Sequence, residues 1–149
     1  MFRRAGSAIA IVLCAVMLTA CTPAIRGMVG VRLDSQGHIH GVLESCDEPV
    51  RSVSLYVVDS EGRHLETVEE WDVPAAEDTN EIAVSALQLT AFDDRNFELN
   101  AWAGDKRLQE VRFTLADIRL LDAGEVLFTD TETYDTIVGS EQVFRDAAC

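Results

Sequence analysis

The chain has 149 residues and a net charge of −14 at pH 7, because 26 Asp and Glu residues outnumber 12 Lys and Arg residues. An acidic surface of this kind repels phosphate groups, which excludes nucleic acid and anionic lipid headgroups as charge-driven partners. The length is that of one domain with a sizeable hydrophobic core.

The first 20 residues have the pattern of a secretory signal. Arg3 and Arg4 precede an uncharged run at 5–20, which is shorter than the roughly 20 apolar residues that a membrane-spanning helix needs. The stretch "LTAC", Leu18 to Cys21, resembles the lipobox of bacterial lipoproteins. This resemblance implies cleavage before Cys21 and a diacylglyceryl thioether on its sulfur. An ordinary secretory signal or a short uncleaved anchor is the alternative.

The lipobox divides the chain into three parts. Residues 1–20 are the expected signal peptide, 21–27 a short tether and 28–149 a folded domain. Loss of the signal removes two of the 12 basic residues and none of the 26 acidic ones, so acyl chains rather than a polybasic patch must supply the attachment. The tether contains no long Ser, Gly or Pro linker. We therefore expect the domain to lie close to the cell membrane, on its extracytoplasmic face.

The expected location outside the cytoplasm assigns a role to each of the four cysteines. Cys14 leaves with the signal and Cys21 carries the lipid, so Cys46 and Cys149 remain outside the cytoplasm, where disulfides persist. A bond between them closes a loop of about 100 residues and stabilises the fold by about 4–5 kcal/mol in the chain-entropy model. We expect this disulfide; two free thiols are the alternative.

From residue 28 onward the hydrophobic pattern is that of β-strands. Two Asp-Ser-x-Gly turns, at 34–37 and 59–62, indicate hairpins in which Gly takes the left-handed position. About seven short strands separated by regular turn signals predict a β-sandwich. The expected strand segments are 28–33, 38–43, 53–57, 64–68, 81–86, 97–102 and 111–113.

One segment narrows the class of sandwich. Leu89 is followed eight positions later by Phe97, an aromatic residue that opens an alternating strand. This spacing resembles the E–F corner of immunoglobulin-like and fibronectin-III-like sandwiches, which usually place Tyr where Phe97 stands. We therefore expect a fold of that class, without the hydrogen bond that the corner tyrosine makes.

The end of the chain predicts short helices. Thr114 to Asp117 has the spacing of a capping box and begins a helix at 118–121, and Ser140 caps a second helix. Val143 and Phe144 would dock this second helix on the body and carry Cys149 toward Cys46. We expect this C-terminal segment to be a latch that closes the sandwich.

Much of the mature chain is similar to small actinobacterial lipoproteins that have no assigned function. The stretches that carry the resemblance are "EVRFTLADIRLLDAGEVLF", the early cysteine and the closing "EQVFRDAAC". These motifs are structural, so the resemblance implies no functional residue.

Two histidines form the candidate site for a metal or a small ligand. His38 and His40 lie on one face of a predicted strand, because side chains alternate with a period of two. Zinc takes such imidazoles together with a carboxylate and an open position, and His64 could add a third nitrogen. The alternative is that these are polar residues on the solvated face of a hairpin.

Catalytic motifs are absent from the sequence. It contains no Gly-x-Ser-x-Gly elbow, phosphate-binding loop or dinucleotide-binding glycine pattern. The acidic pairs do not match a calcium-binding EF-hand loop. We therefore expect a non-catalytic accessory or binding protein without a cofactor.

A polar and aromatic face is the candidate for partner binding. If Leu99 points into the core, Asn100 and Trp102 point outward, and Tyr56 lies on the neighbouring strand of an immunoglobulin-like sheet. Together with Arg112 these side chains suit contact with an unidentified protein or a cell-wall sugar. The alternative is that the C-terminal latch covers the two aromatic rings.

Overall fold

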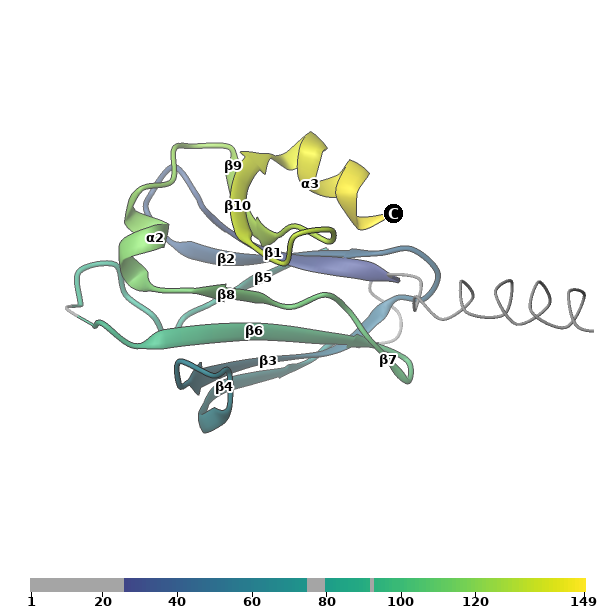
Figure 1. The fold of residues 1–149 in the computed structure, drawn as a ribbon, viewed down its shortest axis with the longest axis horizontal. Helices are drawn as coiled ribbons and strands as arrows, with labels where there is room; N and C mark the ends of the chain where they lie inside the picture. Colours follow the sequence, from purple (N-terminus) through teal and green to yellow (C-terminus); the bar gives the residue numbers. More distant parts are fainter. Residues whose placement is uncertain (1–25, 75–79, 92) are drawn as a thin grey trace, which may run out of the picture.

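The structure is a computed structural model that describes residues 26–74, 80–91 and 93–149 (Figure 1). The expected signal peptide and Cys21, the expected site of lipid attachment, lie outside the described residues. Within the described part of the chain, no helix combines the length and the apolar character needed to cross a membrane.

Two antiparallel five-stranded sheets pack face to face, one above the other in Figure 1. The first sheet has the order β10-β9-β1-β2-β5, with β1 (Gly27–Leu33), β2 (Ile39–Ser45), β5 (Glu81–Ala83), β9 (Glu125–Thr129) and β10 (Thr136–Ser140). The second has the order β4-β3-β6-β7, with β8 also paired to β6; its strands are β3 (Val50–Val58), β4 (His64–Asp72), β6 (Asn96–Ala103), β7 (Lys106–Arg107) and β8 (Val111–Phe113). The order β1-β2-β5 facing β4-β3-β6-β8 is that of an immunoglobulin-like sandwich, which confirms the predicted class.

The prediction of a helical latch after residue 113 was incomplete, because β9 and β10 extend the first sheet there. In β9, Val126, Leu127 and Phe128 are all buried. A strand covered on both faces does not alternate, so the period-two signal that identified the earlier strands is missing.

The core between the sheets comes from the inward side chains of both. Val29 and Leu43 of the first sheet pack in one buried cluster with Leu55, Leu99 and Phe113 of the second. Helix α2 (Leu115–Arg119) contributes to the same cluster with two buried side chains and begins at the predicted capping box. It lies at one end of the sandwich (Figure 1).

Both predicted hairpin turns are present. Gly37 and Gly62 have φ values of 82° and 80°, the left-handed region that glycine enters without strain. In each turn an Asp side chain accepts hydrogen bonds from the amides two and four residues later: Asp34 from Gln36 and His38, and Asp59 from Glu61 and Arg63. The two hairpins therefore share one local design, which their sequences predicted.

Helix α3 (Glu141–Ala148) covers the outer face of the first sheet. Phe144 and Ala148 are buried there against Met28 and Phe128. Val143 is 51% exposed, so the prediction that it docks the helix was wrong; residues 144 and 148 share the buried stripe, whereas 143 lies outside it.

The expected pairing of Cys46 with Cys149 is present, with their Cα atoms 5.6 Å apart. It joins the residue after α3 to the loop that follows β2. A neighbouring ion pair, Arg145 with Glu44, holds the same helix to β2. The latch is thus fixed by packing, charge and a covalent bond.

We predict that the disulfide supplies a large share of the stability. Relative to the wild type, the double variant Cys46→Ser/Cys149→Ser should lose about 3–5 kcal/mol of unfolding free energy, because its unfolded chain regains the entropy of a long open loop. Chemical denaturation without reductant measures this. Ala147→Ser, at an exposed position of α3, is the control. A loss below about 0.5 kcal/mol in the double variant would show that packing alone holds the latch.

Candidate ligand-binding cleft

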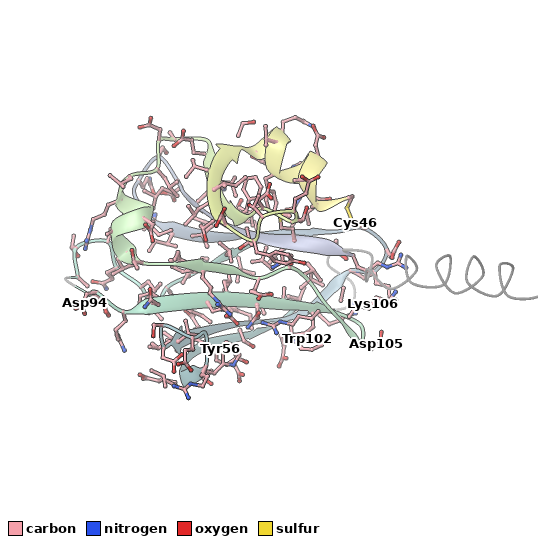
Figure 2. The ribbon with its side chains drawn as sticks, in the orientation of Figure 1. Cys46, Tyr56, Asp94, Trp102, Asp105 and Lys106 are labelled. Atoms are coloured by element: carbon pink, nitrogen blue, oxygen red, sulfur yellow. A yellow bond between two sulfur atoms is a disulfide. The ribbon has the colours of Figure 1, made fainter. Side chains whose placement is uncertain are left out.

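The outer face of the second sheet carries the aromatic residues expected to bind a partner. Tyr56 and Trp102 lie on β3 and β6, which pair as predicted, opposite Glu98 and Ser52 respectively. Both lie on the side of the sandwich away from α3 (Figure 2), so the C-terminal latch does not cover them. Trp102 is 40% exposed, whereas Tyr56 is half-buried and stacks on the ring of His64, with the centroids 3.9 Å apart.

The prediction that Asn100 is available to a partner was wrong. Asn100 points outward from the sheet but is only 2% exposed, because the guanidinium of Arg107 extends over it. Arg107 Nη2 donates to Asn100 Oδ1 at 2.6 Å, and Asn100 Nδ2 donates to Glu98 Oε1 at 2.9 Å. Strand alternation gives the side of the sheet on which a residue lies, but not whether a long neighbour covers it.

Glu98 is the centre of this polar network and is only 1% exposed. Its Oε1 lies 2.9 Å from His64 Nε2 and 3.0 Å from Arg107 Nη2, and its Oε2 accepts from Arg112 Nε at 2.7 Å. Burial raises the pKa of Glu98, but the hydrogen bonds from His64, Arg112 and Asn100 outweigh burial and lower the pKa below its ordinary value. Arg112, which was expected to contact a partner, is bonded to Glu98 instead. The network joins residues of the fold to one another and does not itself indicate a ligand.

We predict that Glu98 stabilises the protein in a pH-dependent way. Because its pKa is lowered on folding, its contribution is complete above the unfolded value of about 4.5 and is lost as the pH falls through the folded pKa. Glu98→Gln should cost about 1–3 kcal/mol of unfolding free energy near neutral pH, and this difference should shrink below pH 4.5.

Urea denaturation of both proteins across the acid range measures the effect. Glu66→Gln is the control, because Glu66 is 64% exposed and pairs with Arg95 only at 3.4 Å. Its cost should stay below about 0.5 kcal/mol. A wild-type advantage over Glu98→Gln that persists unchanged at the acid end would contradict a structural role for the ionised carboxylate.

A cleft of about 520 Å³ opens at the end of the sandwich where β1 turns into β2. Its size falls within the roughly 300–1,000 Å³ typical of small-molecule sites. One side is the hairpin turn and the start of β2, and the other is the segment after β5. The lining residues are Asp34, Gly37, His38, Ile39, His40, Ala83, Val84, Ser85, Leu87, Gln88, Leu89 and Thr90.

Apolar side chains form most of this surface. Ile39 and Val84 belong to the buried core, and Leu87 and Leu89 are half-buried and pack against it. A Cβ atom placed on Gly37 would lie 4.0 Å from Leu89 Cδ1, so the hairpin turn and the 84–90 segment face each other directly. An apolar group entering the cleft would thus be contacted from both sides.

The 84–90 segment has no regular secondary structure, yet both of its ends are held. Glu69 on β4 accepts hydrogen bonds from Ser85 Oγ at 2.8 Å and from the amide of Ala86 at 3.0 Å. Arg119 on α2 donates to the carbonyls of Leu89, at 2.9 Å, and Ala91. These side chains come from two other elements, so the wall of the cleft is fixed before a ligand binds.

The polar end of the cleft is organised by Asp34. Its Oδ1 accepts from two amides of its own turn, and its Oδ2 faces His38 Nδ1 at 3.0 Å and His40 Nε2 at 3.3 Å. The hydrogen bond from the His38 amide is the main reason that the pKa of Asp34 is lowered, with further lowering by the two imidazoles. His40 Nδ1 also lies 2.8 Å from Glu81 Oε1, whose partner oxygen is bonded to Arg32.

The two histidines therefore meet at the cleft, as their spacing predicted, but their nitrogens face carboxylates. Among the described residues, no group of three or more His, Cys, Asp or Glu side chains could hold a metal ion. His64, considered as a third ligand, lies on the other sheet and faces Glu98. The geometry is that of a hydrogen-bonded polar cluster beside an apolar surface.

The cleft and the start of the described chain lie at opposite ends of the molecule. Strand β1 runs seven residues from Gly27 to Leu33, a length of roughly 20 Å, and Asp34 follows directly. In Figure 1 the start of β1 and the C-terminus lie at one end, with α2 at the other. Figure 2 places Cys46 and Asp94 in the same way, at opposite ends.

The sequence identified the two histidines and the corner at Leu89, but not that they form one site. Their segments are about 50 positions apart, and nothing in either one predicts the contact with the other. Comparison of the chain with protein-family models, curated proteins and solved structures found no match. The function has to be inferred from the geometry.

Proposed function

We propose that the protein is a lipid-anchored, extracytoplasmic binding protein of non-catalytic type, and that the cleft is its ligand site. The observation that carries this proposal is a preformed cleft with an apolar floor and one organised polar end. This combination suits an amphiphilic small molecule, whose apolar part is buried while its polar group hydrogen-bonds. The lipobox-like "LTAC" supports the anchor.

The position of the cleft fits such an anchor. A lipid on Cys21 would lie only a few residues before Arg26, at the end of β1 that is far from the cleft. Arg26 itself pairs with Asp47 at 2.7 Å, which holds this end of the chain to the loop after β2. The cleft would then open away from the membrane, toward ligands in the envelope.

The lipid anchor is tested by metabolic labelling with a palmitate analogue. Cys21→Ser should abolish the label, because the acylated sulfur is removed. Cys14→Ser is the matched control and should retain it, since Cys14 lies within the expected signal. Label that survives in Cys21→Ser would overturn the lipobox interpretation.

Ligand binding is tested with 1-decanol, an uncharged amphiphile, by titration calorimetry of the mature domain. Ala83 is exposed and lines the cleft, so Ala83→Phe should fill the cleft without disturbing the core and weaken decanol binding by about tenfold or more. Ala147→Phe places the same ring on α3 and should bind as the wild type does. If decanol does not bind, or binds Ala83→Phe equally well, the cleft is not the ligand site.

A further inference from the structure

The side chains at the polar end of the cleft differ in the hydrogen bonds that they can still form with a ligand. Asp34 already has two amides and two imidazoles around its oxygens, and His40 has a carboxylate at each ring nitrogen. His38 directs only Nδ1 at Asp34, and its side chain is 66% exposed. In the neutral imidazole that donates from Nδ1 to Asp34, Nε2 is a hydrogen-bond acceptor. The head group that suits it is a hydrogen-bond donor.

Charge at the cleft favours one kind of donor. Among the described residues that line it, Asp34 is ionised and none is Lys or Arg. Behind the lining, Glu81 and Glu69 are matched in number by Arg32 and Arg119, so among the Asp, Glu, Lys and Arg residues named around the cleft Asp34 is one carboxylate in excess. The whole chain adds a net charge of −14. A carboxylate head group would meet repulsion without a cationic partner, whereas an ammonium group would be attracted.

We propose that the cleft selects amphiphiles with a cationic, hydrogen-bond-donating head group, of the alkylammonium class, over anionic amphiphiles such as alkyl carboxylates. The ammonium group donates to His38 Nε2 close to the Asp34 carboxylate. The alkyl chain lies between Ile39 on one side and Leu87 and Leu89 on the other. This inference rests on the proposed function of the cleft and adds the chemical class of its ligand.

Three probes of equal chain length separate the head group from the chain: decylammonium, 1-decanol and decanoate. Titrated into the mature domain at pH 7 and low salt, below their micellar concentrations, they should bind in that order of affinity. Decylammonium should bind at least about tenfold more tightly than decanoate, and added salt should narrow this ratio by screening.

Asp34→Asn tests the source of the selectivity. The amide oxygen of Asn can still accept from the amides of the turn, so the hairpin is kept while the charge is removed. The ratio of decylammonium to decanoate affinity should fall to about threefold or less, because the attraction of the ammonium group and the repulsion of the carboxylate both lose their source. Asp59→Asn makes the same change in the matching turn, outside the cleft lining, and should leave the ratio as it is.

The outcomes distinguish this inference from the proposed function. If all three probes bind with equal affinity and Ala83→Phe blocks them, the cleft is the ligand site but the head-group selectivity is overturned. Decanoate binding most tightly overturns it as well. If none of the probes binds, the proposed function fails first. If Asp34→Asn does not fold, the order of the three affinities in the wild-type protein still tests the head-group selectivity. His38→Leu, which changes an exposed side chain, then provides the second variant.

Discussion

The carboxylate of Asp34 fixes the end of the molecule on which the functional proposal depends. By accepting from the amides of Gln36 and His38 it closes the turn between β1 and β2, which sets Leu33 opposite Ile39. A slip of one residue would turn Ile39 from the core to the other face of the sheet. The same carboxylate orients both imidazoles, so one side chain determines the floor and the polar end of the cleft.

The two ends of the sandwich have different designs. At the end away from the cleft, the Cys46–Cys149 disulfide and the Arg26–Asp47 pair hold the chain near its first described residues and at its C-terminus. At the cleft, the wall is an irregular segment held by the side chains of Glu69 and Arg119 and by the hydrogen bond from the Val84 amide to the Ile39 carbonyl. The covalent crosslink therefore lies at the end where an anchor would attach, whereas the wall of the cleft is held by hydrogen bonds and packing.

Local sequence signals predicted local structure well. The two Asp-Ser-x-Gly turns and the caps at Thr114 and Ser140 each depend on residues a few positions apart, and the structure has all of them. Features that depend on distant residues were missed. Asn100 is buried only because Arg107 extends over it. Strand β9 shows no alternation of apolar and polar residues, because both of its faces are covered. The cleft forms where two segments that are distant in the sequence meet.

The most direct test is a crystal structure of the mature domain with bound decylammonium. It should place the nitrogen within about 3.2 Å of His38 Nε2 and the alkyl chain against Ile39 and Leu87, with the 84–90 segment held as it is now. An amphiphile bound instead over Trp102 on the outer face of the second sheet, with the cleft closed, would contradict the account.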